Sequence, residues 1–228
     1  MPRHVLVFDL DDTLYPERQF AVGGFAASER WAQAALGAAP GLAEEMTRLL
    51  DAGHLGTLFP MVLKTCAPDH TPDHLAAFVA AYREHEPALT LFDDAAWALQ
   101  HYSAQGPLGL ITDGTHTVQA RKVEALAIGP HFREIVYTNA LGGRTFHKPH
   151  PLSYEKIEAA LGGPDVRLVY VGDNPSKDFI VPNARGWLSV MVERPDHARI
   201  HASAEMAEGG APHARIQSLR ELPRVIGN

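Results

Sequence analysis

Three aspartates follow a short apolar run near the start of the chain, and their spacing suits metal chemistry. The run extends from Val5 to Phe8, and Asp9, Asp11 and Asp12 come directly after it. A run of this kind predicts a strand buried on both faces, so the carboxylates should lie where the strand ends. Because side chains alternate along a strand, Asp9 and Asp11 should point to one side and Asp12 to the other. Two converging carboxylates repel unless a cation lies between them, which favours a hard divalent metal such as Mg2+. The alternative is a strand followed by an Asp-rich turn.

Composition limits the classes of partner. The chain has 228 residues, of which 46% are hydrophobic and 21% charged, as in an ordinary soluble protein. A net charge of −7 argues against a nucleic acid polymer or an anionic membrane as partner, since both favour basic patches. A bound metal would still allow an anionic substrate. The single cysteine, Cys66, permits no internal disulfide, so we expect a cytoplasmic location. We also expect neither a signal peptide nor a membrane span.

The segment from Glu17 to about Glu84 is rich in alanine and has a helical pattern without strand signals. Breaks at Gly37 to Pro40, at Gly53 and at Pro68 to Pro72 divide it. We expect four helices, at about 18–36, 41–52, 55–65 and 72–84. These helices are inserted after the first strand, so residues 17–87 are predicted to form a separate helical domain.

Beyond Pro87, predicted strands and helices alternate. The strands are expected at 108–112, 134–138, 166–171 and 187–192. The helices are expected at 93–105 and 115–127, after Pro151, and at 176–185. A loop at 197–213 and a short strand and helix within 216–227 complete the pattern. Such alternation predicts an α/β fold, with a doubly wound parallel sheet built from residues 1–16 and 88–228.

Polar residues follow several of these strands at the point where each one ends. Thr112 follows the second strand, Lys148 lies in the loop after the third, and Asp173 follows the fourth. Ligands of parallel sheets bind outside the carboxyl ends of the strands. We therefore expect these side chains to meet the aspartates of the first strand.

Four short motifs now resemble those of the haloacid dehalogenase-like hydrolase superfamily. They occur in the family's order and span nearly the whole chain: Asp9 to Thr13, Thr112-Asp113-Gly114, Lys148-Pro149, and Gly172 to Asp178. The helical insertion between the first and second motifs is similar to the branch with an α-helical cap in that position. The resemblance thus implies a Rossmann-like core with a cap.

The resemblance also implies catalytic roles for two of the aspartates. Asp9 would be the nucleophile that forms an aspartyl-phosphate. Asp11 would protonate the leaving alcohol and then activate water. The first of these tasks requires a protonated carboxyl, which we expect in a shielded, anion-rich pocket.

The remaining motif residues would bind phosphate and metal. Thr112 would bind a phosphoryl oxygen together with the following N–H groups, those of Asp113 and Gly114, and Lys148 would offset negative charge. The residues implied to hold Mg2+ are Asp9, Asp11 through its backbone carbonyl, Asp173 and Asp178. Asp178 would either bind the metal directly or orient another ligand.

Each residue also has a simpler interpretation. Thr112 could simply cap the following helix, and Lys148 could be a surface lysine. Asp173 and Asp178 could be turn and helix-start residues. We assign Asp12 to no chemical role.

Among the family's reactions, the residues favour a phosphatase. Its dehalogenases lack an aspartate at the position of Asp11, and its phosphonate hydrolases use a lysine of the cap, where this chain has only Lys64. The implied substrate is a small phosphorylated metabolite, either a nucleoside monophosphate or a sugar phosphate. The alternatives are a phosphomutase similar to β-phosphoglucomutase and a non-catalytic binding module on the same fold.

Overall fold

The computed structural model describes residues 3–54, 56–195, 197, 199–200 and 205–227. The chain divides into two compact units, one of residues 1–16 with 90–228 and one of residues 17–89. The sequence placed this boundary at 87/88. Within the described part of the chain, no helix combines the length and the apolar character needed to cross a bilayer.

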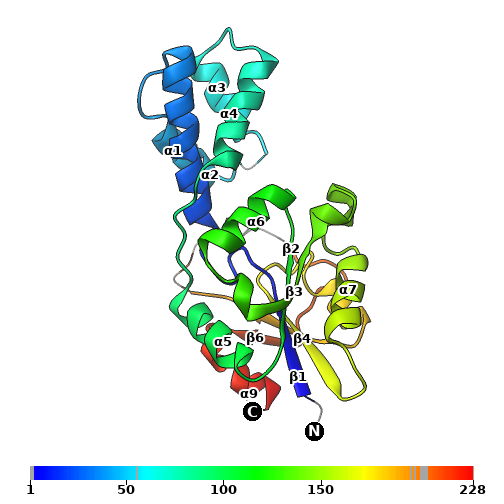
Figure 1. Cartoon of the computed structure of the whole chain (residues 1–228). Helices are drawn as coiled ribbons and strands as arrows, with labels where there is room; N and C mark the ends of the chain where they lie inside the picture. The colour runs from blue at the N-terminus through cyan, green and yellow to red at the C-terminus, as the bar shows by residue number, and fades with distance from the viewer. Residues whose placement is uncertain (1–2, 55, 196, 198, 201–204, 228) are drawn as a thin grey trace. The chain divides into compact units, whose positions relative to one another are not determined.

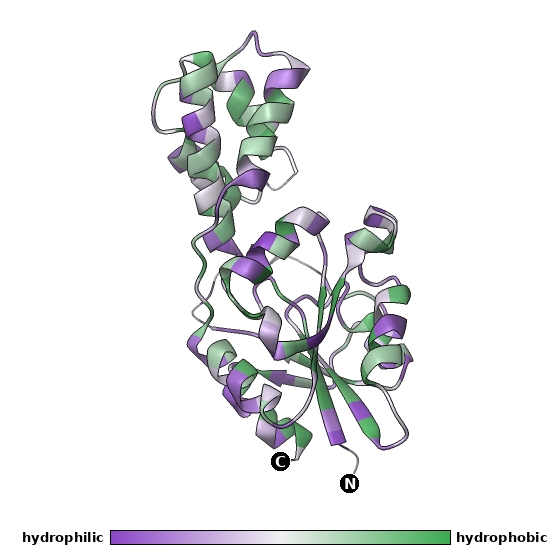
Figure 2. Cartoon of the chain, in the orientation of Figure 1, coloured by the Kyte–Doolittle hydropathy of each residue, from purple (hydrophilic) through white to green (hydrophobic). Residues whose placement is uncertain are grey.

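A parallel sheet of six strands forms the centre of the first unit, in the order β3-β2-β1-β4-β5-β6 (Figure 1). The strands are β1 (Arg3–Phe8), β2 (Leu108–Thr112), β3 (Phe132–Tyr137), β4 (Val166–Gly172), β5 (Leu188–Val192) and β6 (Ala214–Ile216). The central strands are apolar along most of their length, and Figure 2 shows apolar residues concentrated there. Such strands require cover on both faces. The predicted doubly wound α/β fold is confirmed.

Helices cover both faces of the sheet. Figure 1 shows α7 on one side and α5 with α9 on the other. The helices of this unit are α5 (Asp93–Ser103), α6 (His116–Ala125), α7 (Leu152–Leu161), α8 (Ile180–Ala184) and α9 (Leu222–Ile226), with 3-10 turns at η1 (Gly129–His131), η2 (Thr138–Leu141), η3 (Arg144–Phe146) and η4 (Leu219–Glu221). Helix α7 packs closely because Gly109 of β2 has no side chain. A Cβ at Gly109 would lie 3.0 Å from Ile157 Cδ1 and 3.1 Å from Leu161 Cδ1.

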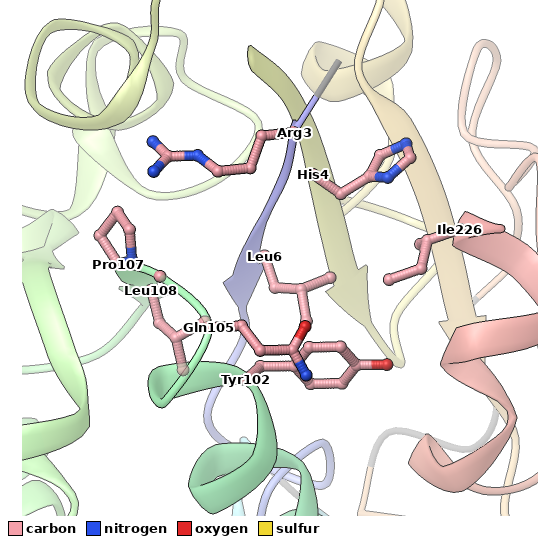
Figure 3. Close-up of a pocket in the computed structure, with 9 residues that line it drawn as sticks. Arg3, His4, Leu6, Tyr102, Gln105, Pro107, Leu108 and Ile226 are labelled. Atoms are coloured by element: carbon pink, nitrogen blue, oxygen red, sulfur yellow. The ribbon is translucent and has the colours of Figure 1, made fainter. Parts of the chain in front are cut away.

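The opposite face of β1 borders a small cavity of about 120 Å³. Its lining includes Arg3 and Leu6 of β1, Tyr102 of α5 and Ile226 of α9 (Figure 3). Arg3 begins β1, so this cavity lies toward the amino end of the strand and not at the carboxyl end where Asp9 follows.

The second unit contains α1 (Glu17–Leu36), α2 (Leu42–Asp51), α3 (Leu58–Cys66) and α4 (Pro72–Glu84). Thr71 begins α4 with a capping box, in which its hydroxyl accepts from His74 N at 3.3 Å. Aromatic rings hold α1, α3 and α4 together, and Phe59 lies 4.9 Å from Tyr82 between ring centroids. Gly24 allows α1 to approach α4, since a Cβ there would lie 2.4 Å from Tyr82 Cδ2.

The element boundaries differ from the predicted ones at a few places. The predicted helix at 176–185 is helical only at 180–184, because the Asn174 side chain accepts from Ser176 N and forms a turn before it. The helix expected from residue 55 begins at Leu58, and residue 55 lies outside the described residues. Part of the predicted loop at 197–213 also lies outside them, and residues 205–213 contain no helix or strand.

Candidate active site

Adjacent parallel strands bring the polar ends of β1, β2 and β4 to one edge of the sheet. Phe8 of β1 pairs with Val171 of β4 and with Leu110 of β2. Asp9 extends the ladder by one bond, from its N–H to the carbonyl of Val171 at 2.9 Å. Asp9 directly follows β1 and Asp173 directly follows β4, so the two residues leave neighbouring strands at the same edge of the sheet.

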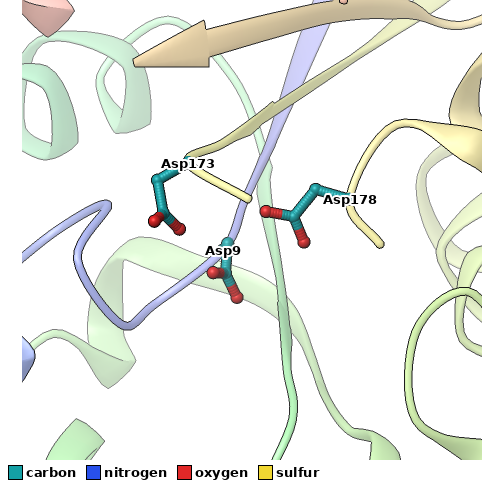
Figure 4. A group of neighbouring side chains, drawn as sticks. All are labelled: Asp9, Asp173 and Asp178. Atoms are coloured by element: carbon teal, nitrogen blue, oxygen red, sulfur yellow. The ribbon is translucent and has the colours of Figure 1, made fainter. Parts of the chain in front are cut away.

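Asp9, Asp173 and Asp178 form a buried cluster in which one oxygen of each lies within 4.8 Å of the others (Figure 4). The turn after β4 sets Asp178, whose Oδ2 accepts from Asn174 N at 2.9 Å. Gly172 makes room for this carboxylate, because a Cβ there would lie 2.5 Å from Asp178 Oδ2. We refer to these three residues below as the carboxylate cluster.

Lys148 reaches the carboxylate cluster with a completely buried side chain. Its Nζ lies 2.6 Å from Asp9 Oδ1 and 2.7 Å from Asp178 Oδ1, and it donates to the Tyr170 hydroxyl at 3.0 Å. Burial lowers the pKa of Lys148, but Asp178 and Asp9 more than offset this and hold it well above its usual value. Lys148 is therefore an ammonium ion between two carboxylates.

The three carboxylates face two cations, Lys148 and the more distant Arg199. Burial raises the pKa of Asp9 to about 6, although Lys148 opposes this. Burial, together with Asp178 and Asp9, also raises the pKa of Asp173 well above its usual value. The Arg199 guanidinium forms a long ion pair with the Asp173 carboxylate, at 3.6 Å between Nη1 and Oδ2. Three carboxylates whose charge two cations compensate only in part fit a hard divalent cation.

Asp11 is separate from the carboxylate cluster, and its surroundings differ from the expectation. Its Oδ1 accepts from Lys122 Nζ at 2.7 Å and from the Tyr15 hydroxyl at 2.5 Å, and its Oδ2 accepts from Gln119 Nε2 at 2.8 Å. Burial raises the pKa of Asp11, but Lys122 and these donors outweigh it and lower the pKa below its usual value. The expectation of an anion-rich pocket is therefore wrong for Asp11, because α6 places the Lys122 ammonium and the Gln119 amide beside its carboxylate.

The sequence analysis missed Gln119 and Lys122. Helix α6 buries Val118, Gln119, Lys122 and Val123, so two long polar side chains occupy positions of its apolar stripe. Polar residues at i and i+3 on the buried face of a helix need partners, and this was the available signal.

The backbone of Asp12 has a φ of 53°. Its side chain contacts residues other than those around the carboxylate cluster. Its Oδ1 lies 2.8 Å from His197 Nε2, and its Oδ2 accepts from Ile200 N at 3.0 Å. These contacts give Asp12 a structural role in holding the chain beyond β5.

The second motif, Thr112-Asp113-Gly114, lies beside both Asp11 and the carboxylate cluster. Thr112 is completely buried, and its Oγ1 accepts from Gln119 Nε2 at 2.5 Å. The Asp113 carboxylate accepts from the Lys148 backbone N–H at 3.0 Å and from Lys177 Nζ at 3.0 Å. Burial raises the pKa of Asp113, but Lys148 and Lys177 outweigh it and hold the pKa at about 2. Gly114, with φ of 120°, lets the chain turn into α6.

Comparisons with known proteins agree with this architecture. A family model described as haloacid dehalogenase-like hydrolase matches residues 4–180. A glyceraldehyde 3-phosphate phosphatase of Methanopyrus kandleri is 29% identical over 231 residues, which cover 97% of this chain and 96% of that protein. A glyceraldehyde 3-phosphate phosphatase of Methanocaldococcus jannaschii is 25% identical, with coverage of 98% and 96%. The crystal structure of the HAD-hydrolase YfnB of Bacillus subtilis, bound to magnesium, matches with a TM-score of 0.75 at 17% identity over 100% of both chains.

Proposed function

This chain belongs to the haloacid dehalogenase-like hydrolase family, and on that premise we propose that it hydrolyses a small phosphomonoester through an aspartyl-phosphate on Asp9. The observation that carries the proposal is the position of Asp9 at the end of β1, 2.6 Å from Lys148 Nζ and within the carboxylate cluster. Asp9 is the member of the cluster that the first motif marks as a nucleophile. The two phosphatases with full-length similarity to this chain support the same reaction class.

The proposed reaction has two steps. In the first, a carboxylate oxygen of Asp9 bonds to phosphorus, the bond from phosphorus to the ester oxygen breaks, and Asp11 gives its proton to the leaving alcohol. In the second, a water oxygen bonds to phosphorus, the bond to Asp9 breaks, and Asp11 takes a proton from the water. Inorganic phosphate leaves, and both aspartates return to their first state.

The environment of Asp11 suits one of these steps directly. Its donors favour the ionised carboxylate, which is the form that accepts a proton from water. The first step needs the protonated form. The anionic phosphoryl group of a bound substrate raises the pKa of a neighbouring carboxyl, and this favours protonation of Asp11 when substrate is present.

We propose that Asp9, Asp173 and Asp178 hold Mg2+, together with the backbone carbonyl of Asp11. The charge imbalance at the carboxylate cluster supports this assignment, as does the magnesium bound to YfnB. When bound, Mg2+ would stabilise negative charge that develops on the phosphoryl oxygens.

The phosphoryl group would be bound by the second and third motifs. Lys148 supplies a buried positive charge, and Thr112 supplies a hydroxyl. Asp113 and Gly114 contribute through their backbone N–H groups, because the Asp113 carboxylate is occupied by its three donors. We propose that the helical unit serves as the cap, since it is inserted between the first and second motifs.

A small sugar phosphate is the favoured substrate. The support is the similarity to two glyceraldehyde 3-phosphate phosphatases, whose substrate is a three-carbon phosphorylated aldehyde. No observation of this chain favours a nucleoside monophosphate to the same degree.

The test is phosphate release from a panel of sugar phosphates, nucleoside monophosphates and an aryl phosphate, with Mg2+ and with chelator. Wild type, Asp9→Asn and the control Asp165→Asn are compared, because Asp165 is an exposed carboxylate before β4. We expect Mg2+-dependent release that is lost in Asp9→Asn and kept in Asp165→Asn. Release by Asp9→Asn at the wild-type rate would contradict the proposal. Conversion of a sugar phosphate to its isomer without release of phosphate would favour a mutase.

A further inference from the structure

We propose that Gln119 and Lys122 of α6 are positioning residues that hold the Asp11 carboxylate and the Thr112 hydroxyl in the orientation needed for catalysis. This inference rests on the proposed function, because it concerns the residue that exchanges the proton. It adds two side chains that lie outside the four motifs.

Gln119 connects the ends of two strands through one nitrogen. Its Nε2 donates to Asp11 Oδ2 at 2.8 Å and to Thr112 Oγ1 at 2.5 Å, and its side chain is almost completely buried. A hydroxyl that accepts a hydrogen bond on one lone pair keeps its own proton to donate. Gln119 therefore directs the Thr112 proton away from itself while it restrains Asp11.

Lys122 fixes the other oxygen of Asp11. Its Nζ lies 2.7 Å from Asp11 Oδ1, and the lysine side chain is 4% exposed. Lysine is almost never buried to this degree without a charged partner. The Tyr15 hydroxyl donates to the same oxygen. Both carboxylate oxygens of Asp11 are thus hydrogen-bonded, and the group cannot rotate without breaking a hydrogen bond.

The turn after β2 places both residues over the site. β2 ends at Thr112 and α6 begins at His116, so the helix starts within four residues of the strand end. Gly114 makes this approach possible, since a Cβ there would lie 3.1 Å from the Gln119 side chain and its φ is 120°. The spacing of three residues then puts Gln119 and Lys122 on one face of α6.

The consequence for catalysis depends on the leaving group. An alkoxide is a poor leaving group and needs the proton of Asp11, whereas an acidic phenol such as p-nitrophenol leaves without it. The ratio kcat/KM covers the reaction up to cleavage of the ester bond. A misplaced Asp11 should therefore reduce kcat/KM for alkyl phosphates more than for p-nitrophenyl phosphate.

The experiment compares Gln119→Leu, Lys122→Met and Lys122→Arg with wild type and with Gln105→Leu. Gln105 is an exposed glutamine that follows α5 and lines the remote cavity, so it is the matched control. kcat/KM is measured with Mg2+ for p-nitrophenyl phosphate and for the best alkyl phosphate of the panel. Melting temperature by circular dichroism confirms that each variant is folded.

We expect the ratio of alkyl to aryl kcat/KM to fall at least tenfold in Gln119→Leu and Lys122→Met, because general acid catalysis contributes about 10² to 10⁴ in rate. Lys122→Arg should recover part of the loss, since it keeps the cation, and Gln105→Leu should match wild type. Equal losses for both substrates, or wild-type activity in Lys122→Met, would overturn the inference while leaving the proposed function intact. Failure of wild type on both substrates would overturn the proposed function itself.

Discussion

Replacing Asp113 by asparagine should destabilise the core unit in a way that depends on pH. The Asp113 carboxylate accepts from Thr138 Oγ1 at 2.8 Å, from the Lys148 N–H at 3.0 Å and from Lys177 Nζ at 3.0 Å. An asparagine oxygen can still accept from the first two donors. The substitution therefore removes the charge and the pairing with Lys177, and leaves the shape unchanged.

The size of the effect follows from the pKa. Burial raises the pKa of Asp113, but Lys148 and Lys177 outweigh it and lower the pKa from 3.8 to about 2. A difference of one in pKa corresponds to about 1.4 kcal/mol, so the ionised Asp113 contributes about 2 kcal/mol. Because the pKa is lower in the folded state, this contribution is present above pH 4 and is lost as the pH falls from about 4 to about 2.

The measurement is urea unfolding in chelator at pH 7, 4, 3 and 2.5. A Trp31→Phe background restricts the fluorescence signal to Trp97 and Trp187, which both lie in the core unit. We expect Asp113→Asn to lower the free energy of unfolding by about 2 kcal/mol at pH 7, and the difference to shrink toward zero near pH 2. A loss of the same size at pH 3 and at pH 7 would refute the electrostatic reasoning.

Two further predictions concern the carboxylate cluster. Lys148→Met should lower the stability of the metal-free protein by about 3 to 5 kcal/mol, because it leaves Asp9 and Asp178 buried without their ammonium, and saturating Mg2+ should reduce this loss in urea unfolding. An equal loss with Mg2+ and with chelator would contradict a shared role of lysine and metal. Gly172→Ala should raise the Mg2+ concentration needed for half-maximal activity by about 10-fold or more, since the new Cβ would displace Asp178. The control Gly163→Ala should leave it unchanged, because a Cβ there meets Val166 Cγ2 at an ordinary 3.7 Å.

The elements that could be predicted from the sequence are those with strong local signals. The strand at 108–112 has its predicted bounds, because an apolar run ends there in a polar turn. The helix at 72–84 also has its predicted bounds, because Thr71 and Pro72 form a clear start signal. The alternation of predicted strands and helices along the chain then indicated a parallel sheet, without any knowledge of contacts.

The parts that could not be predicted depend on contacts between distant residues. Asp113 appeared as a phosphate-binding residue, yet its carboxylate is held by Thr138, Lys148 and Lys177, which lie 25, 35 and 64 positions further along the chain. Lys122 meets Asp11 across 111 positions. Local periodicity carries no information on such pairs. For Lys122, the available signal was its position, with Gln119, in the apolar stripe of α6.

The opposite environments of Asp9 and Asp11 are a consequence of this tertiary arrangement. The two residues are two positions apart, yet burial raises the pKa of Asp9 to about 6, whereas Lys122 and its neighbours lower that of Asp11. Asp9 shares the Lys148 ammonium with Asp178, so its charge is compensated only in part, which fits the proposed metal. Asp11 has its own lysine and two neutral donors, so its charge is compensated without metal. Pairs of carboxylates whose surroundings differ in this way can take different roles in one reaction. The proposed division between nucleophile and proton carrier thus depends less on the Asp-x-Asp spacing than on which lysine each carboxylate contacts.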